Sequence, residues 1–547
     1  MELILFILTY FLLAVNVIGY GYFFATNISS YNKNANIGYI GLYGVFLLTF
    51  ISYLTNLVVK HDYLHNFILL ILGIFFFVKY ISSIKNLNKN KDVKYLIFFL
   101  VLSIFAILYF KSHDDFSYYH LSFIHNLTLN KVEFGLGNFD LAFNHVSSMF
   151  FFHSLFNLPF TNDYFYFIGP VLIMVFSNIV LVKKILIDKK KITFNFFLSF
   201  FIFVFINVFF YRLAEHGTDR SAIILILLSI LLIFQILDNK ILNNKMFENL
   251  IIFLTFIISL KSFYVIYSLL FFIIYFKFFS VSKIITFYKN FKIINISIIF
   301  GLLILFYNIA YTGCLIYPLS FTCSEFFYWS MDISRIELAA NWYELWSKAG
   351  ASPNYRVDDP NDYVRGFNWL SVWVDNYFFN KVSDTSLGLL FVVLFVLITF
   401  RPKKIKFKFN REYFLVFIAL TILLFEWFFN HPSLRYGGYH LLALIFFIPT
   451  AIFLSNQNYQ FAKVYKKIQI ILIISLTVFV LRNIDRILNE YEIYNYNPLN
   501  SPFYKLEQKD YYLKNKKKNI YEKTNNCLSE YKKNHNCKII SSYRFFY

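Results

Sequence analysis

Long apolar runs recur along most of this 547-residue chain, and they constrain its fold more than any other feature. A run of about 18 or more apolar residues is long enough to cross a bilayer as a helix. Hydrophobic residues make up 58% of the chain and charged residues only 15%, whereas a soluble protein carries about 25% charged residues. Segments of about ten alternating residues, which mark a membrane barrel, do not occur. The pattern therefore predicts an all-α, polytopic membrane protein.

We predict about fourteen transmembrane helices, with residues 1–481 forming one polytopic domain and residues 482–547 a polar tail. The first run follows Glu2 without a basic segment ahead of it, which is typical of a membrane helix rather than a signal peptide. The predicted helices span residues 3–27, 37–58, 66–84, 94–110, 163–183, 193–211, 220–237, 247–260, 263–280, 291–311, 386–400, 412–429, 438–455 and 467–481.

Lysine predicts the orientation of these helices. Connections rich in Lys, such as 183–192 and 401–411, alternate with connections poor in Lys. The positive-inside rule places the Lys-rich set in the cytoplasm, and this excess explains the formal net charge of +20 without a nucleic-acid partner. We expect a multi-pass protein of the cytoplasmic (inner) membrane whose active face is periplasmic. The polar segments assigned to that outer face are 111–162, 211–220, 312–385, 430–438 and the tail.

The distribution of Arg is opposite to that of Lys in the predicted connections. The chain holds eleven Arg against forty Lys, yet most of the Arg lie in the predicted outer segments. A guanidinium can bind phosphate or carboxylate through two parallel hydrogen bonds, so the set indicates an anionic partner outside. For any single Arg, ion pairing with outer acids such as Glu215 and Asp219 is the alternative. The outer residues are Arg212, Arg220, Arg335, Arg356, Arg365 and Arg435.

The four Cys fall into two close pairs, Cys314 with Cys323 and Cys527 with Cys537, all in predicted outer segments. Such pairs are expected to form disulfides in an oxidising compartment. A zinc site is the alternative, but no C-x-x-C spacing supports it.

The stretch from His113 to Ser148 lies between two predicted membrane helices and is dense in charged and polar groups. A charged side chain at the bilayer centre costs about 2.5–3.5 kcal/mol or more. This loop must therefore lie at or outside the membrane interface. We interpret it as a catalytic or substrate-binding loop over the membrane.

An apolar stripe runs through the first part of this loop. After Asp115, the residues Phe116, Tyr119, Phe123 and Leu127 recur at helical spacing. The stripe predicts a short amphipathic helix that lies on the membrane surface.

Two carboxylates stand where this helix would begin. Capping the helix needs only one Asp and contributes about 1 kcal/mol. Asp114 and Asp115, with His113 and His120 nearby, form a candidate general base, a candidate site for a divalent cation such as Mg²⁺ or Mn²⁺, or both.

The second part of the loop is rich in hydroxyl and amide side chains. Gly135 and Gly137 allow a tight turn, and the polar residues follow it. Sugar hydroxyls need paired donors and acceptors of this kind, whereas a solvated loop with a helix cap is the alternative. The polar residues are Asn138, Asp140, Asn144, His145, Ser147 and Ser148.

Several motifs resemble a family of uncharacterised bacterial polytopic membrane proteins. They are D-x-x-x-Y-H-L at 115–121, G-L-G-N at 135–138, N-H-V-S-S at 144–148, C-L-I-Y-P-L-S-F-T-C at 314–323, P-S-L-R-Y-G at 432–437 and the terminal Cys pair. That family in turn resembles the GT-C glycosyltransferases, which carry an acidic motif in their first large outer loop. The resemblance implies an enzyme that transfers a sugar from a polyprenyl-phosphate-linked donor to a glycan, lipid or protein of the cell envelope.

The resemblance also implies roles for individual residues. Asp115 would be the catalytic base, and Asp114 would share this role or bind a metal. His120 would orient the carboxylate or contact phosphate, and Arg435 would clamp the lipid phosphate. Asn138, Asn144 and Ser148 would line the sugar site. Further substrate-binding candidates come from their positions in the polar outer segments and not from the resemblance: His113, Asp140, Arg212, His216 and Arg220.

Two other functions stay open. A polysaccharide polymerase or ligase would work through the insertion 312–385, whose Trp residues could stack on sugar rings or anchor the chain at the membrane interface. A flippase for lipid-linked oligosaccharides would suit the helix count, but it needs a polar intramembrane path, and the predicted helices hold few polar residues. The Trp residues of the insertion are Trp329, Trp342, Trp346, Trp369 and Trp373.

Overall fold

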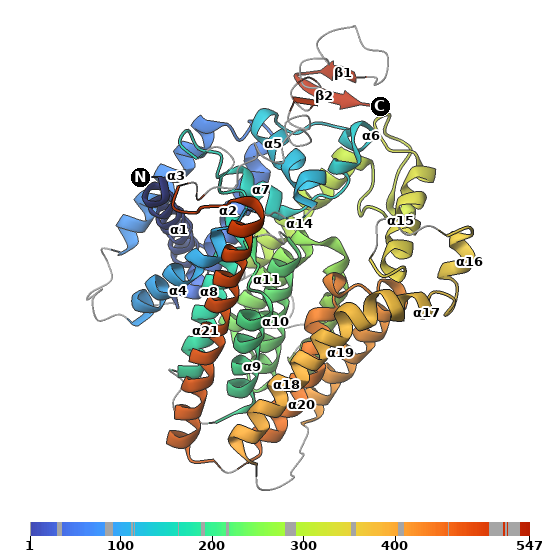
Figure 1. The fold of residues 1–547 in the computed structure, drawn as a ribbon. Helices are drawn as coiled ribbons and strands as arrows, with labels where there is room; N and C mark the ends of the chain where they lie inside the picture. The colour runs from blue at the N-terminus through green and yellow to red at the C-terminus, as the bar shows by residue number, and fades with distance from the viewer. Residues whose placement is uncertain are drawn as a thin grey trace.

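A computed structural model shows the chain as a bundle of helices with a small hairpin near its C-terminus (Figure 1). The described residues are 2–547 except 30–35, 82–90, 111–112, 114, 162–163, 187–191, 215–217, 279–291, 352–356, 403–409, 458, 501, 503–517, 520–521 and 523–536.

The long helices follow one another along the chain, and shorter elements fill the connections between them. The long helices are α1 (Glu2–Asn27), α2 (Ile37–Asn56), α3 (Tyr63–Ile81), α4 (Lys91–Ile107), α8 (Ile168–Leu186), α9 (Phe194–Phe209), α10 (Thr218–Leu237), α11 (Asn244–Leu260), α14 (Lys292–Thr312), α18 (Ser383–Phe400), α19 (Arg411–Asn430), α20 (Gly438–Ser455) and α21 (Phe461–Tyr494). The shorter elements are η2 (Phe116–His120), α5 (Leu121–Leu129), α6 (Leu136–Phe139), η3 (Leu141–Phe143), α7 (Ser148–Ser154), η5 (Ser262–Leu269), α12 (Leu270–Phe278), η6 (Ser320–Thr322), α15 (Ile333–Lys348), α16 (Pro360–Val364), α17 (Leu370–Trp373), η7 (Val374–Val382), η8 (Leu434–Tyr436), β1 (Cys537–Ile540) and β2 (Tyr543–Phe546).

Ten helices of the described chain are long and apolar enough to cross a membrane, so the predicted count of about fourteen is not matched. Helices occupy all the predicted segments, but four of these helices fall short. Helices α4, α9 and α11 have 17, 16 and 17 residues, or about 25 Å of length against a hydrocarbon core of about 30 Å. The fourth segment is divided between the 3₁₀ helix η5 and the short α12. The chain is an all-α, membrane-embedded protein.

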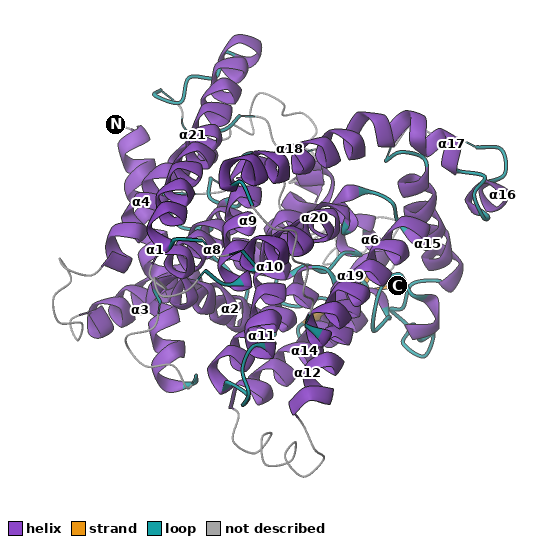
Figure 2. Cartoon of the chain, turned by 90° about the horizontal axis from the view of Figure 1, so that it is seen from below, coloured by secondary structure: helices purple, strands orange, loops and turns teal. Residues whose placement is uncertain are grey.

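Helix α10 forms the axis of the bundle. Seen from below, it lies at the centre, with α8, α9, α11, α19 and α20 around it (Figure 2). Every residue of α10 except Arg220 is buried. A helix that is apolar all round is stable only when other helices surround it, so this sequence dictates its central place. Its first turn carries Asp219.

Glycines let the first three helices approach closely. A Cβ added at Gly44 of α2 would lie 1.8 Å from the carbonyl oxygen of Val17 in α1. A Cβ at Gly19 would lie 1.9 Å from the carbonyl oxygen of Gly73 in α3. Small residues of this kind allow membrane helices to pack backbone against backbone.

Four segments that are far apart in the sequence meet at one end of the bundle, which we call the loop end. Phe134 hydrogen-bonds to strand β2 at 2.8 Å. Asn138 donates to the carbonyl of Trp329 at 2.9 Å, and Trp373 donates to the carbonyl of Pro432 at 3.0 Å. Figure 1 shows the hairpin, α5, α6 and α15 near this end. The segments are 113–161, 313–378, 431–437 and 537–547.

The predicted surface helix after Asp115 is buried on more than one face. Phe116, Phe123 and Leu127 are buried as the stripe predicts, but Ser122 and Ile124 are buried as well. Helix α7 packs against α5, and α14 reaches the same region. The short helix is present, but its second face is covered by other segments, which the stripe alone does not reveal. Its place at the membrane surface stays a prediction.

Helix α21 runs to Tyr494, beyond its predicted end at residue 481. Two buried charges of this extension pair with each other. Nη1 of Arg486 lies 3.3 Å from Oε2 of Glu490, and Nη2 donates to the carbonyls of Phe105 and Leu108 at 2.8 and 2.7 Å. The polar composition that marked the tail is therefore compatible with a continuing helix.

One of the two predicted disulfides is confirmed. Cys314 and Cys323 are bonded across the turn that follows α14. Cys537 begins β1, and its predicted partner Cys527 lies outside the described residues.

Replacing Gly44 by Ala should lower the melting temperature of the purified protein. The added methyl group cannot fit 1.8 Å from the Val17 carbonyl, so α1 and α2 must separate. Gly301→Ala is the matched control, because nothing lies within 4 Å of its added Cβ and Ala favours a helix over Gly by about 1 kcal/mol. Thermal unfolding in detergent should show a loss for Gly44→Ala and no loss for Gly301→Ala. Equal melting temperatures would contradict the close packing of α1 and α2.

Candidate functional site

Asp115 stands at the start of the π-helical turn η2, shortly after α4. Its side chain makes no capping hydrogen bond, so the capping alternative was wrong for this residue. Phe116 is buried beside it, with its ring 4.2 Å from the ring of Phe167. The turn is thus anchored by an apolar side chain while the carboxylate is left for another partner. Single π-helical turns are frequent at functional sites.

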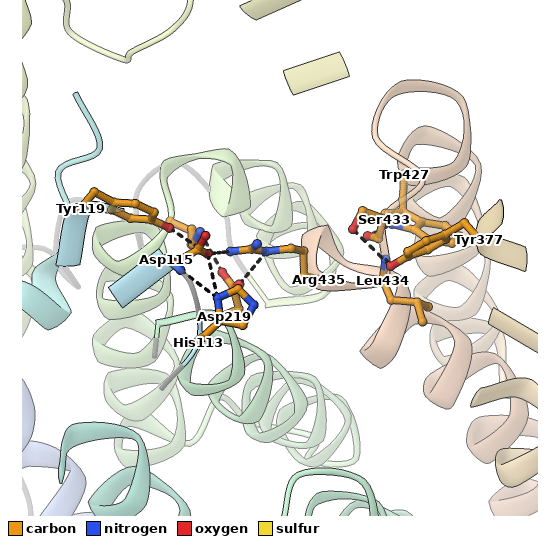
Figure 3. A network of polar contacts seen from close by, with 10 residues as sticks. His113, Asp115, Tyr119, Asp219, Tyr377, Trp427, Ser433, Leu434 and Arg435 are labelled. Carbon is orange, nitrogen blue, oxygen red and sulfur yellow. Dashed lines mark hydrogen bonds and ion pairs between the residues drawn. The ribbon is translucent and has the colours of Figure 1, made fainter. Parts of the chain in front are cut away.

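Arg435 joins Asp115 to Asp219 through its guanidinium (Figure 3). Nη2 of Arg435 lies 2.5 Å from Oδ2 of Asp115, and Nε lies 2.9 Å from Oδ2 of Asp219. Nζ of Lys261 lies 2.7 Å from the other oxygen of Asp219. We call Asp115, Asp219, Lys261 and Arg435 the charge cluster. They come from the start of η2, the start of α10, the end of α11 and η8.

Two further groups approach the Asp115 carboxylate. Nδ1 of His113 lies 3.5 Å from Oδ2, and the hydroxyl of Tyr119 donates to the same oxygen at 3.3 Å. The prediction that His113 lies near Asp115 is confirmed. Tyr119, which the sequence suggested only as part of an apolar stripe, uses its polar end at the site.

The charge cluster carries no net charge and is partly exposed to solvent. Two carboxylates face two cations, and these side chains are 11% to 24% exposed. Burial raises the pKa of the Asp115 carboxyl, but Arg435 and His113 lower it by more, so the pKa lies well below its usual range. Burial lowers the pKa of Arg435, and the two carboxylates raise it well above its ordinary value. Asp115 and Arg435 are therefore both charged at neutral pH.

The turn that carries Arg435 is rigidly held. Trp427 donates to the carbonyl of Ser433 at 2.7 Å, and the backbone N–H of Leu434 donates to the hydroxyl of Tyr377 at 2.9 Å (Figure 3). These bonds come from α19 and η7 on either side of the turn. They fix the direction in which Arg435 points.

Aromatic rings flank the guanidinium. Its central carbon lies 5.9 Å from the ring of Trp346 and 5.8 Å from the ring of Tyr436. Trp346 stacks on Trp342, which is 46% exposed. Burial raises the pKa of Tyr436 to about 12, so this ring stays neutral. Helix α15 of the insertion thus forms one wall of the site.

Two histidines, one buried and one half-buried, lie in the loop that follows the carboxylate. Nε2 of His120 is buried without a hydrogen-bond partner, and Nε2 of His145 lies 2.5 Å from the hydroxyl of Tyr343. Burial lowers the pKa of His120 to about 3 and that of His145 to about 4. Both rings are neutral at pH 7 and can exchange hydrogen bonds but carry no charge.

Two predicted sugar-site residues hold the loop to its neighbours. Asn138 donates to the carbonyl of Trp329 at 2.9 Å, and Ser148 donates to the hydroxyl of Tyr53 at 3.1 Å. Ser148 is fully buried. The amide nitrogen of Asn138 and the hydroxyl of Ser148 therefore support the fold, and the alternative of a solvated loop does not describe the buried Ser148.

Asp140 and Asn144 behave differently from each other. Asp140 accepts from the backbone N–H of Ala142 at 2.8 Å and caps η3. Asn144 donates to the hydroxyl of Tyr317 at 3.2 Å, while its own Oδ1 is buried without a hydrogen-bond partner. Asn144 therefore keeps one unused acceptor in the interior of the loop end.

The remaining candidates are not linked to Asp115 by the contacts described above. Arg220 donates to the carbonyl of Phe209 at 3.2 Å. Arg212 is half-buried in the turn between α9 and α10. Asp114 and His216 lie outside the described residues.

The described donors around Asp115 do not form a divalent-cation site by themselves, and the predicted site that includes Asp114 stays a prediction. Among the residues that the structure describes, no group of three or more His, Cys, Asp or Glu side chains could hold a metal ion. The guanidinium of Arg435 occupies an oxygen of Asp115 and would repel a second cation. Asp114, the other predicted ligand, lies outside the described residues.

Sequence reasoning missed two members of the charge cluster as site residues. It assigned Asp219 to a charged turn and overlooked Lys261. A signal was present, because Lys261 follows an apolar helix directly on the predicted outer side, where Lys is otherwise rare. What the sequence did not reveal is that the start of α10 and the end of α11 lie beside Asp115.

The chain belongs to the family described as a domain of unknown function (DUF8201), whose model matches residues 1–442. The match includes all four residues of the charge cluster and ends within α20. No curated protein and no solved structure matches the chain.

His120→Phe should make the protein less sensitive to acid. The pKa of His120 is about 3 in the folded chain and about 6.5 in an unfolded one, so the unfolded chain binds the extra proton between these values. The contribution of the neutral ring to the free energy of unfolding is complete above about pH 6.5 and is lost as the pH falls toward the folded pKa. The loss is about 2 kcal/mol at pH 5. Melting temperatures measured from pH 7.5 to 5 should fall less steeply in the variant. The melting temperature of His145→Phe should also fall less steeply with pH. If both variants keep the wild-type slope of melting temperature against pH, the two histidines are not held neutral in the fold.

Proposed function

We propose that this member of the DUF8201 family is a GT-C-like membrane glycosyltransferase. It transfers a sugar from a polyprenyl-phosphate-linked donor to a glycan, lipid or protein of the cell envelope, at the periplasmic face of the cytoplasmic membrane. The observation that carries the proposal is the contact of Asp115 with Arg435 at the loop end of a membrane-embedded bundle.

Glycosyl transfer from a lipid phosphate needs two groups, one on each side of the anomeric carbon. One is a base beside the acceptor hydroxyl, and the other is a cation beside the departing phosphate. Asp115 and Arg435 are such a pair, and their side chains are 21% and 24% exposed. A guanidinium suits this task because it binds phosphate through two parallel hydrogen bonds.

The chemical step follows from these positions. Oδ2 of Asp115 takes the proton of the acceptor hydroxyl while the hydroxyl oxygen forms a bond to the anomeric carbon. The bond between that carbon and the phosphate oxygen breaks, and its electron pair stays on the lipid phosphate. Arg435 holds the resulting charge. Inversion at the anomeric carbon is expected from this single displacement.

Donor binding would also activate the base. In the absence of donor, Arg435 keeps the pKa of Asp115 low, and a carboxylate in that state is a poor base. A donor phosphate competes with Asp115 for Nη2 of Arg435, while Asp219 keeps hold of Nε. Once the guanidinium charge is shared with phosphate, burial raises the pKa of Asp115 and makes it a better base.

The acceptor side of the site would use neutral groups. His120 has an unpartnered, buried Nε2 in the segment that follows Asp115, which can orient a hydroxyl. Trp342 and Trp346 present aromatic faces next to Arg435. In contrast, Trp369 and Trp373 are buried and bond to backbone carbonyls, so they serve the fold.

The polymerase or ligase hypothesis places the catalytic function in residues 312–385, and the transferase hypothesis places it in residues 111–148. Both segments contribute to the loop end, since Trp346 contacts Arg435 while Asp115 pairs with it. Loss of activity on changing one segment does not separate the two functions. Product analysis does, because a polymerase or ligase extends or transfers a chain whereas the transferase adds one sugar.

Asp115→Asn should reduce transfer about 100-fold or more, because a general base contributes 10²–10⁴-fold. The variant should still fold, since Arg435 keeps Asp219 as its partner. The assay uses full-length protein in lipid with a panel of polyprenyl-phosphate sugars. Asp375→Asn removes an exposed carboxylate of η7 as the matched control and should be fully active. Full activity of Asp115→Asn would exclude Asp115 as the base.

Asp115→Asn and Asp219→Asn should change the affinity for undecaprenyl phosphate in opposite directions. Asp115 competes with the lipid phosphate for Arg435, so its loss should tighten binding about tenfold. Asp219 positions Arg435 and pairs with Lys261, so its loss should weaken binding. Each substitution removes one negative charge from the same cluster, which makes the pair its own control.

Titration of the lipid into purified protein, followed by calorimetry or native mass spectrometry, measures both affinities. Tighter binding in both variants would mean that only net charge matters. No change in either would mean that Arg435 does not bind the phosphate.

A further inference from the structure

A cleft of about 650 Å³ opens at the loop end, separate from the charge cluster. Three parts of the chain line it: the turn between α2 and α3 with the start of α3, the segment after α5, and the terminal hairpin. None of the four charge-cluster residues contributes to its walls. The volume lies within the range of about 300–1,000 Å³ that small-ligand sites occupy.

Cations from each of the three parts meet in this cleft. Lys60 comes from the turn before α3, Lys131 from the segment after α5, and Arg544 from β2. The two acids in the wall are Asp62 and Glu133. Three cations and two carboxylates leave a net charge of +1, which complements one negative charge.

Part of this polar wall is fixed in place. Nη1 of Arg544 lies 3.1 Å from Oε1 of Glu133, which is buried. Nζ of Lys131 lies 2.6 Å from the hydroxyl of Ser542 and 3.8 Å from the ring centre of Tyr543. The hairpin therefore orients two of the three cations. Lys60 is half exposed and lies 3.6 Å from Asp62, so it can turn toward a ligand.

The opposite wall of the cleft is apolar and continues along a membrane helix. Leu64 and Ile68 line the cleft, and Ile71 and Phe75 follow them at positions i+7 and i+11 of α3. These four side chains are 49% to 70% exposed. They form one stripe of about 16 Å on a helix whose membrane-spanning window is only 22% buried. An exposed stripe of this kind on a membrane helix faces lipid.

We propose that this cleft binds one anionic glycerophospholipid. Its phosphodiester is held by Lys60 and Lys131 beside the fixed Arg544, and an acyl chain lies along the stripe of α3. The charge of +1 favours a lipid with one net negative charge over a zwitterionic lipid, and the continuous apolar stripe favours a lipid over a soluble phosphate. This site is independent of the proposed glycosyl transfer.

Binding of phosphatidylglycerol and phosphatidylcholine with identical acyl chains tests the site. Full-length protein, stripped of lipid in detergent, is titrated with each lipid and followed by native mass spectrometry. Wild type should bind one phosphatidylglycerol at least tenfold more tightly than phosphatidylcholine. The double variant Lys60→Ala/Lys131→Ala should lose this preference. Equal affinities in wild type, or a preference that survives in the double variant, would overturn the proposal.

Matched controls separate the site from general charge effects. Lys240→Ala/Lys463→Ala removes two exposed lysines outside the cleft and should keep the preference. Leu64→Glu adds a negative charge at a side chain that is 70% exposed, so it should leave the fold intact and lower phosphatidylglycerol affinity at least tenfold. Displacement of the lipid by equimolar glycerol 3-phosphate would show that the stripe contributes nothing and would also overturn the proposal.

Discussion

The guanidinium of Arg435 holds two carboxylates that belong to distant parts of the chain, and the arrangement of the loop end depends on this contact. Asp115 follows α4, Asp219 begins the central helix α10, and Arg435 lies between α19 and α20. Charges that are mostly buried are costly unless they are paired, and removing one partner of such a pair costs about 3–5 kcal/mol. The first loop therefore cannot leave the end of α10 without exposing an uncompensated charge.

The composition of the charge cluster is compatible with the proposed exchange of partners between Asp115 and a phosphate. Its carboxylates and cations balance, and Lys261 supports Asp219 from the side opposite Arg435. An incoming phosphate can take the place of Asp115 while the rest of the cluster keeps its partners. The turn that carries Arg435 is fixed by aromatic side chains, so the exchange needs little movement. A rigid cation facing a replaceable carboxylate connects the packing of this end of the bundle to the proposed chemistry.

The first loop, the insertion and the terminal hairpin act as one structural unit. Helix α15 supplies the aromatic wall beside Arg435, and β2 pairs with Phe134 and closes the lipid-facing cleft. The two proposals thus give the loop end two phosphate sites: the balanced cluster for the phosphate that leaves the donor, and the cleft of net positive charge for a lipid that stays bound. Both open where membrane helices end, which is where a lipid headgroup resides.

The sequence by itself determined the class of this protein and the identity of several key residues. Apolar runs of membrane length can only be buried in lipid or in other helices, so the all-α membrane class followed directly. The contrast between rare Arg and abundant Lys indicated six outer Arg, and the paired acids indicated Asp114 and Asp115; the resemblance then selected Arg435 and Asp115 among them. Tertiary structure decided the rest. It joined Asp115 to Arg435, added Asp219 and Lys261, turned Asn138 and Ser148 into supports, and shortened several helices below membrane length. The physical reason is that charges are paired and apolar faces are covered by residues that lie hundreds of positions away in the sequence. A local sequence pattern does not show which distant residues these are.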